Sequence, residues 1–220
     1  CHLAHDAPMH EGIVSTELGL SGQPGAAEDV MVARDIILAE LTGAHLHIAH
    51  VSTAGAVRLV REARARGVRV TAEVTPHHLL LTDDAARSYD PNVKMSPPLR
   101  TKRDVEACLE ALVDGTIDCV ATDHAPHALA EKEGEFAEAA NGNVGLETAV
   151  PLLLDRLVRP GVLDLPTLVT RLSAAPARLL GLPGGTLAPG AQADVTILDL
   201  DQPWSVNPAA FQSRSRNTPF

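Results

Sequence analysis

The most chemically suggestive stretch of the chain runs from Ile117 to His127. A short apolar segment ends there in Asp123, His124 and His127. A buried parallel strand delivers reactive side chains at its carboxyl end in this way. An aspartate at that position can ligate a divalent metal and also take a proton from an attacking water. Because a lone Asp-His pair is more often a hydrogen-bonded turn, the stretch predicts a site only in combination with other residues.

Histidines follow two earlier predicted strands. His50 closes the first of them, and His77 and His78 follow the second. The carboxyl ends of strands in a βα barrel share one face, so we expect these side chains to converge with Asp123. Nitrogen and oxygen donors without a thiolate cluster suit zinc in an open catalytic site. His50 could equally be a core histidine, and for His77 and His78 a structural role is favoured, with one of them a partner of a metal ligand.

The elements that would carry these residues alternate along the chain. Three strands are predicted, at 45–51, 68–74 and 117–122. Amphipathic helices are predicted at about 26–41, 53–66, 101–114 and 146–158, followed by two short helices at about 166–173 and 176–181. In the first helix we expect Val30, Ala33, Ile37, Leu38 and Leu41 to face the core. Consecutive βα units predict an α/β fold with a parallel sheet and right-handed crossovers.

The two ends of the chain have a different composition. Residues 1–25 carry histidines among several glycines and prolines, which predicts an irregular segment. From Gly181 to Gly190 the helical period disappears, and Ala193–Leu200 then reads as a strand. We therefore expect a small β-rich segment after the βα units.

Composition excludes several function classes. A formal net charge of −10 argues against a nucleic-acid surface. No apolar run approaches the roughly 20 residues of a membrane span, and no signal peptide opens the chain, so a cytoplasmic protein is expected. The three cysteines, Cys1, Cys108 and Cys119, have no metal-like spacing and fit a reducing compartment. Because the first residue is not methionine, we expect a piece of a longer product.

Five motifs together resemble the bacterial-type dihydroorotases of the amidohydrolase superfamily. They are His47-Ile48-Ala49-His50-Val51-Ser52-Thr53, Ala72-Glu73-Val74-Thr75-Pro76-His77-His78-Leu79, Lys94-Met95-Ser96-Pro97-Pro98-Leu99-Arg100, Ala121-Thr122-Asp123-His124-Ala125-Pro126-His127 and Gly145-Leu146-Glu147-Thr148. The resemblance implies a distorted TIM barrel flanked by a small β-domain and a metal centre usually of zinc. It also implies the reversible cyclisation of N-carbamoyl-L-aspartate to dihydroorotate.

The resemblance implies roles for individual residues. His50 resembles the metal-ligating histidine at the end of strand six, and Asp123 resembles the ligand and general acid-base at the end of strand eight. His127 resembles the histidine that contacts the substrate's carboxylate, and Asn141-Gly142 stand where a backbone segment touches the pyrimidine ring. Ser96 stands where the family commonly has a substrate-binding asparagine. A hydroxyl reaches less far than an amide, so that contact is expected to pass through water.

The resemblance and the strand count agree on the extent of the domain. Residues 1–181 are expected to form the C-terminal part of a TIM-like (β/α)8 barrel, about strands 6–8 with their helices. Residues 182–220 are expected to form part of the small β-domain, truncated at its end. Two convincing ligands are fewer than the about three that a catalytic zinc needs. The remaining ligands of one or two zinc ions are expected upstream of Cys1, so this piece alone should be inactive.

Two other functions remain open. A related cyclic amidase, such as hydantoinase or allantoinase, would share the metal centre but would not need His127. A non-catalytic homologue that scaffolds aspartate carbamoyltransferase would lack metal ligands. We expect a small-molecule substrate and neither a nucleic-acid nor a membrane partner, with a homodimer or a complex with aspartate carbamoyltransferase compatible with the family.

Overall fold

Three parallel strands form the sheet that positions the candidate residues. The computed structural model describes residue 3 and residues 7–220. The strands are β3 (Leu46–Ile48), β4 (Val70–Val74) and β5 (Cys119–Val120), with β4 in the middle. Leu46 pairs with Val70, and Glu73 pairs with Cys119. The parallel βα arrangement expected from the sequence is confirmed.

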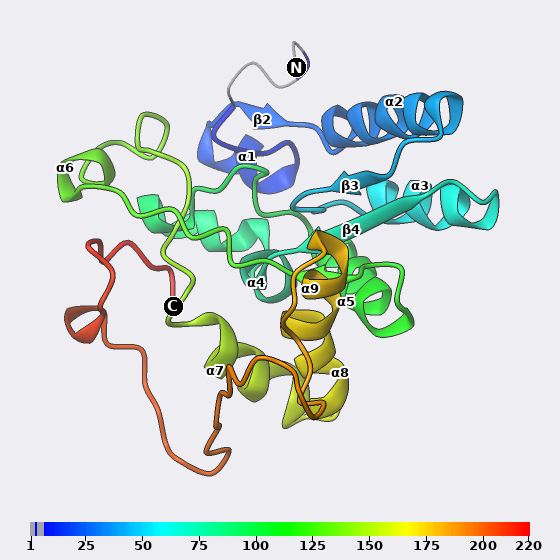
Figure 1. Cartoon of the computed structure of the whole chain (residues 1–220). Coiled ribbons are helices and arrows are strands. Elements are labelled where there is room, and N and C mark those ends of the chain that lie inside the picture. Colours follow the sequence, from blue (N-terminus) through cyan, green and yellow to red (C-terminus); the bar gives the residue numbers. More distant parts are fainter. Residues whose placement is uncertain (1–2, 4–6) are drawn as a thin grey trace.

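Helices follow the strands in the order that the sequence predicts. The larger ones are α2 (Ala26–Thr42), α3 (Ala54–Ala65) and α5 (Lys102–Asp114). The shorter ones are α1 (Ile13–Leu18), α4 (Pro76–Leu80), α6 (Leu129–Lys132), α7 (Ala149–Leu153), α8 (Leu165–Val169) and α9 (Ala175–Leu180). Figure 1 shows α2 and α3 beside each other next to β3 and β4, with α7, α8 and α9 on the other side of the molecule.

Local capping explains where the larger helices begin and end. The Thr53 side chain accepts a hydrogen bond from the backbone N–H of Ala56 at the start of α3. Thr101 and Asp104 form a reciprocal capping box at the start of α5, and Gly115 ends that helix in a left-handed conformation.

Irregular helical turns connect the other elements: the 3-10 turns η1 (Asp83–Ser88), η2 (Pro91–Val93) and η5 (Pro208–Ala210) and the π-helical turns η3 (Leu154–Val158) and η4 (Thr170–Ala174). The helix predicted at 146–158 is therefore α7 continued by η3.

The main core lies between the sheet and the helices. Its buried members come from β3, β4, α2, α3, α5, α7 and α8, among them Val60, Val74, Leu112, Leu153 and Leu168. In β4 the burial alternates, because Val70, Ala72 and Val74 are buried while Thr71 and Glu73 are half-buried on the opposite face. That alternation leaves the second face of the strand free for polar chemistry.

The buried face of α2 differs from the prediction. Ala27, Val32, Ile36 and Ala39 are buried. The predicted core set was wrong for four of its members, since Val30, Ile37, Leu38 and Leu41 are 50–79% exposed. The reason is that α2 is apolar on two sides, and α3 covers only one of them.

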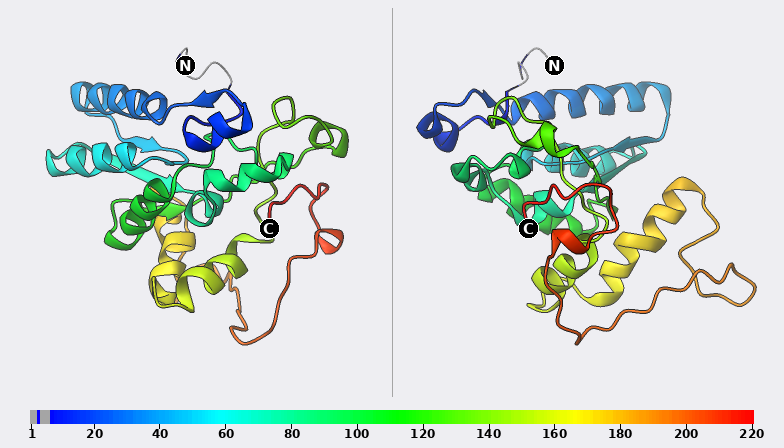
Figure 2. Two further views of the ribbon diagram at one scale, coloured as in Figure 1. Left: turned by 180° about the vertical axis from the view of Figure 1, so that it is seen from behind. Right: turned by 90° about the vertical axis from the view of Figure 1, so that its left-hand side faces the viewer.

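Both ends of the chain also depart from expectation. The segment expected to be irregular holds α1 and two short parallel strands, β1 (Met9–His10) and β2 (Gly22–Gln23). The predicted strand Ala193–Leu200 was wrong, because residues 193–200 form no strand. A strand needs a hydrogen-bonding partner, and Val195 and Ile197 are 61% and 90% exposed. Figures 1 and 2 show a long irregular trace between α9 and η5, after which the end of the chain returns to the loop before α7, where Gln212 and Ser213 bond to Glu147.

No helix among the described residues is long and apolar enough to cross a membrane.

Candidate active site

The structure brings His50 and Asp123 together. Nε2 of His50 lies 3.6 Å from Oδ1 of Asp123, and the two side chains are 30% and 27% exposed. His50 follows β3 and Asp123 follows β5, so the pair spans the carboxyl ends of the strands on either side of β4. The predicted convergence of these two residues is present in the structure.

Both residues have an unusual backbone. The φ angle is 53° at His50 and 48° at Asp123. A left-handed conformation costs a non-glycine residue free energy and persists only where the surrounding structure imposes it. Among the described residues only Tyr89 shares this feature without being glycine. The fold therefore enforces a strained conformation at the two residues that the sequence selected on chemical grounds.

Glu73 of β4 lies between these two strands and was not selected from the sequence. Its Oε1 lies 2.9 Å from Nδ1 of His50, and its Oε2 lies 3.2 Å from Nε2 of His47. Although burial opposes ionisation, bonds from His47 and His50 lower the pKa of Glu73 to about 2. The bond to Glu73 and the charge of Asp123 raise the pKa of His50, against the effect of burial. Glu73 could have been identified from the sequence, because it is a carboxylate within a predicted strand that neighbours the strand before His50.

The His50–Asp123 pair fits a metal ion. Two ligand atoms of a tetrahedral zinc ion at about 2.0–2.2 Å from the ion lie about 3.4 Å apart. The observed separation of Nε2 and Oδ1 is 3.6 Å. One imidazole nitrogen and one carboxylate oxygen are also donors that zinc accepts. The two donor atoms and the distance between them therefore suit a divalent ion whose other ligands are different residues.

A second group with metal-ligand chemistry lies beside this pair. Ligand atoms of His47, Glu73 and Cys119 lie within 4.8 Å of one another. Burial raises the pKa of the Cys119 thiol to about 11, and both oxygens of Glu73 already contact imidazoles. This group is consequently less suited to an ion than the His50–Asp123 pair.

The predicted substrate residues His127, Asn141 and Gly142 also lie together. Nε2 of His127 is 2.8 Å from the carbonyl oxygen of Asn141. The N–H of Gly142 donates to the carbonyl of Lys94 at 2.8 Å, two residues before Ser96. Ser96 itself is exposed, and no hydrogen bond of its side chain occurs within the described part of the chain. The loops thus converge, while a substrate contact of Ser96 stays a prediction.

Two buried lysines hold the loop that carries Asn141 and Gly142. The ammonium of Lys94 donates to the carbonyls of Ala137 and Ala139 at 2.6 and 2.7 Å. The ammonium of Lys132 donates to the carbonyls of Ala140 and Gly142 at 2.7 and 3.1 Å. Burial lowers the pKa of Lys132 to about 8. The sequence predicted a role for Asn141 and Gly142 but not for the two lysines that hold their loop.

The last residues of the chain complete the same loop cluster. Asn217 is 6% exposed. Its Nδ2 donates to the carbonyls of Ala125 and Gly142 at 2.9 and 3.1 Å, and its Oδ1 accepts from the N–H of His127 at 3.3 Å. Sequence reasoning missed this residue, because nothing local links position 217 to positions 125–142.

His77 and His78 are buried and neutral. Burial lowers the pKa of His78 to about 4 and that of His77 well below its usual value. Nδ1 of His78 is 2.8 Å from the Thr75 hydroxyl, and its Nε2 is 2.9 Å from the carbonyl of Pro97. Nε2 of His77 has no hydrogen-bond partner among the described residues. His78 therefore has a structural role in tying the end of β4 to the loop after Ser96.

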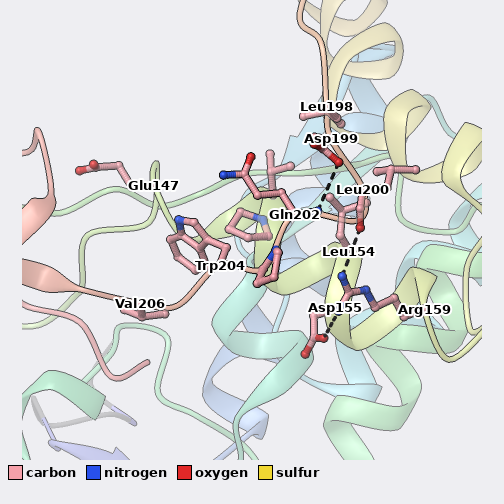
Figure 3. Close-up of a pocket in the computed structure, with 13 residues that line it drawn as sticks. Glu147, Leu154, Asp155, Arg159, Leu198, Asp199, Leu200, Gln202, Trp204 and Val206 are labelled. Atoms are coloured by element: carbon pink, nitrogen blue, oxygen red, sulfur yellow. Dashed lines mark hydrogen bonds and ion pairs between the residues drawn. The ribbon is translucent and has the colours of Figure 1, made fainter.

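A pocket also lies away from this site. It has a volume of about 640 Å³ and is lined by α7, η3 and the segment that contains Leu198, Gln202 and Trp204. Figure 3 shows these side chains around Leu154 and Asp155. None of the predicted site residues lines it. We give the His50–Asp123 geometry more weight, because a pocket without convergent reactive groups has no evident chemistry.

Comparisons with curated proteins show what the chain is similar to. It is 60% identical over 221 aligned residues to a dihydroorotase of Anaeromyxobacter dehalogenans, covering 100% of this chain and 51% of the relative. It is 59% identical to a dihydroorotase of Pelotomaculum thermopropionicum, with the same coverage of both chains. The chain thus spans about half the length of these curated relatives.

Solved structures with a similar fold come from related enzymes. An L-hydantoinase (dihydropyrimidinase) from Arthrobacter aurescens matches with a TM-score of 0.86 and 35% identity, over 90% of this chain and 45% of that one. A dihydropyrimidinase from Brevibacillus agri matches with a TM-score of 0.73 and 33% identity, over 78% and 39%. These neighbours imply a TIM-barrel-type α/β fold. A model of the amidohydrolase family matches residues 6–219, and the chain therefore belongs to that family.

Proposed function

We propose that the complete polypeptide is a dihydroorotase, which interconverts N-carbamoyl-L-aspartate and dihydroorotate in pyrimidine synthesis. The observation that carries this proposal is the pairing of His50 and Asp123 at 3.6 Å, with both residues in left-handed conformations. Relatives of 60% identity named dihydroorotase support this substrate over the hydantoins and dihydropyrimidines of the structural neighbours, which are 35% and 33% identical.

The proposed metal ion is zinc, held by His50 and Asp123 together with ligands from outside this chain. When bound, the ion supplies a Lewis acid that polarises the scissile carbonyl and acidifies the attacking water. Asp123 takes the proton of that water during ring opening and gives it to the leaving amide nitrogen. In the direction of synthesis the same carboxylate performs these transfers in reverse.

The loop residues orient the substrate in this proposal. The imidazole of His127 meets the exocyclic carboxylate of dihydroorotate, and the backbone of Asn141 and Gly142 contacts the ring. Nδ1 of His127 lies 3.7 Å from the carboxylate of Glu131, so the substrate's carboxylate would have to replace that acidic partner. Ser96 contacts the substrate through water, because a serine hydroxyl is shorter than the usual amide.

We further propose that residues 1–181 form about strands 6–8 of a (β/α)8 barrel and that residues 182–220 belong to a small β-domain. The open edges of β3 and β5 and the exposed apolar side of α2 support the first assignment. The unpaired segment 193–200 supports the second. In both assignments, the rest of the polypeptide would cover the open strand edges and the exposed side of α2, and would pair with segment 193–200. We place the protein in the cytoplasm, as a homodimer or in complex with aspartate carbamoyltransferase.

The test is a substrate comparison with the complete polypeptide. Dihydroorotate, hydantoin and dihydrouracil are offered to the purified zinc-loaded protein, and ring opening is followed for each. We expect a clear preference for dihydroorotate. Preference for hydantoin or dihydrouracil would assign the chain to the hydantoinase side of the family, and the absence of any turnover would favour the non-catalytic scaffold.

A variant of His127 separates substrate binding from packing. A charge-assisted hydrogen bond contributes roughly 1.5–3 kcal/mol, so His127→Ala should lower kcat/KM for dihydroorotate about 10- to 150-fold. Dihydrouracil lacks the carboxylate, and any residual activity toward it should change much less. An equal loss on both rings would show that His127 only packs its loop.

A further inference from the structure

We infer that Glu73 is a positioning residue, which holds the imidazole of His50 with Nε2 toward Asp123 and is itself held by His47 and Thr71. The inference rests on the proposed function, since it takes Nε2 of His50 as a metal-binding atom. It concerns a carboxylate that does not touch Asp123 and that the proposed reaction does not use.

The contact between Glu73 and His50 is the first support. Oε1 of Glu73 lies 2.9 Å from Nδ1 of His50, and the approach is bent away from the ideal N–H direction. That nitrogen is buried and has no other polar partner within the described residues. The backbone adds a second tie, because the N–H of Val51 donates to the carbonyl of Glu73 at 2.9 Å. Glu73 therefore holds the turn at His50 with its side chain and its main chain.

The second oxygen of Glu73 is held from the other side. Oε2 lies 3.2 Å from Nε2 of His47, and Nδ1 of His47 lies 2.9 Å from the Thr71 hydroxyl. An ionised carboxylate only accepts hydrogen bonds, so His47 donates from Nε2 and accepts from Thr71 at Nδ1. Nε2 of His45 lies 3.0 Å from the same hydroxyl, which can accept from it. The single proton of the Thr71 hydroxyl can go to the carbonyl oxygen of Leu46 at 3.3 Å or to the closer Nδ1 of His47 at 2.9 Å. Donation to Nδ1 gives a direction of donation that leads toward Glu73.

Strand register explains why these side chains meet. His47 is paired with Thr71, and Ile48 with Ala72. The bond from the N–H of Val51 to the carbonyl of Glu73 keeps the two chain segments side by side beyond His50. Side chains two apart on a strand share a face, so Thr71 and Glu73 stand on the half-buried face of β4, away from the core. The pleat thus places His47, Thr71 and Glu73 together, whereas His50 reaches Glu73 through its left-handed backbone, because positions 47 and 50 of a regular strand would face opposite sides.

The arrangement fixes which nitrogen of His50 is presented to the ion. A metal-ligating histidine commonly donates its other ring N–H to a carboxylate, which sets the tautomer and the ring orientation. With Nδ1 turned to Glu73, only Nε2 faces Asp123. Loss of the carboxylate would leave the ring free to rotate, and metal affinity would fall without any change in the ligands themselves.

Zinc affinity of the complete polypeptide provides the test, measured by competition with a chelator. Glu73→Gln keeps the shape, but its amide can accept from one imidazole only. We expect zinc binding about 10- to 100-fold weaker, as for other partners of metal ligands. The visible absorption bands of the cobalt-substituted protein should also shift, because they report ligand geometry. Glu73→Asp keeps the charge but is one methylene shorter, and it should show a smaller loss of the same kind.

Two control variants show whether the loss of zinc is specific to Glu73. Asp118→Asn removes a carboxylate of the same sheet that is held by Arg64 and the N–H of Ala72 and is not in contact with His50. Cys119→Ala removes the third member of the group formed with His47 and Glu73. Both should leave zinc affinity and the cobalt spectrum unchanged. A loss of zinc in Cys119→Ala as large as in Glu73→Gln would indicate an ion in that group and overturn the positioning role.

The outcomes separate this inference from the proposed function. If His50→Ala loses zinc while Glu73→Gln and Glu73→Asp retain wild-type affinity and spectrum, Glu73 has no positioning role and the metal site stands. If His50→Ala retains zinc, the proposed metal site fails and the inference fails with it. Circular dichroism of each variant identifies loss of fold, and the milder Asp variant decides the question where Glu73→Gln does not fold.

Discussion

At the scale of single residues, the candidate site depends on His50 and Asp123, whose side chains lie 3.6 Å apart. Asp123 and His50 stand out because reactive side chains follow apolar segments. Their left-handed backbone could not be predicted, because it is imposed by contacts between loops that are distant in sequence. Glu73 was read only as part of a strand, since its partners His47 and His50 become neighbours through strand register.

The first prediction concerns the proposed base. Asp123→Asn keeps the size of the side chain and removes its ability to accept a proton. We expect turnover of dihydroorotate by the complete polypeptide to fall by at least about 100-fold. Asp118→Asn serves as the matched control and should retain its rate, because Asp118 is held by Arg64 away from the site. Wild-type turnover in Asp123→Asn contradicts the assigned role.

At the scale of elements, the bounds of helices were predicted well, because capping residues close in sequence determine them. Thr53, the Thr101–Asp104 pair and Gly115 delimit α3 and α5, whose bounds lie within one residue of the predicted ranges 53–66 and 101–114. The strand predicted at 193–200 failed, because a strand is stable only with a partner and none lies within the described residues. The loops around the site were equally beyond local rules, since residues more than 70 positions apart hold them.

The second prediction concerns Asn217, which ties the loops of Ala125, His127 and Gly142. Asn217→Ala leaves the half-buried carbonyl of Ala125 without its donor and removes one of the two donors to the buried carbonyl of Gly142, so it should lower the free energy of unfolding by about 1–3 kcal/mol. The KM for dihydroorotate should rise more than kcat falls, because the loops bind rather than react. Asn207→Ala is the control, since Asn207 caps only the exposed turn η5. Equal urea denaturation curves for Asn217→Ala and the wild type would remove this role.

The third prediction concerns pH and Lys132. Burial lowers its pKa from 10.5 to about 8 in the folded state. Below pH 8 the folded state bears the cost of a buried charge. Between about pH 8 and 10.5 it holds fewer protons than the unfolded state, so this residue makes the protein more stable as pH rises.

Lys132→Met removes that contribution. The stability of the wild type relative to the variant should increase from pH 8 to pH 10.5, measured by urea denaturation of the complete polypeptide. Lys102→Met is the matched control, because the Lys102 side chain is 85% exposed. A constant difference between wild type and Lys132→Met across this range would show that burial does not perturb Lys132.

At the scale of the whole molecule, the chain spans about half the length of the curated relatives it matches. It covers 51% of its curated relatives, and its sheet has two open edges. The α/β class and the order of its elements followed from periodicity alone. The exposed face of α2 did not, because hydrophobic spacing identifies apolar sides without saying which neighbour covers each one. Positions near the middle of the sheet were therefore predicted better than those on the exposed side of α2.

The most direct test of the central claim is the zinc content of the complete polypeptide. His50 and Asp123 lie 3.6 Å apart in a geometry that suits two ligands of one ion. We predict that purified wild-type protein contains zinc and that His50→Ala, purified in parallel, contains less per chain while keeping the wild-type circular dichroism. Unchanged zinc stoichiometry in a folded His50→Ala protein would contradict the account.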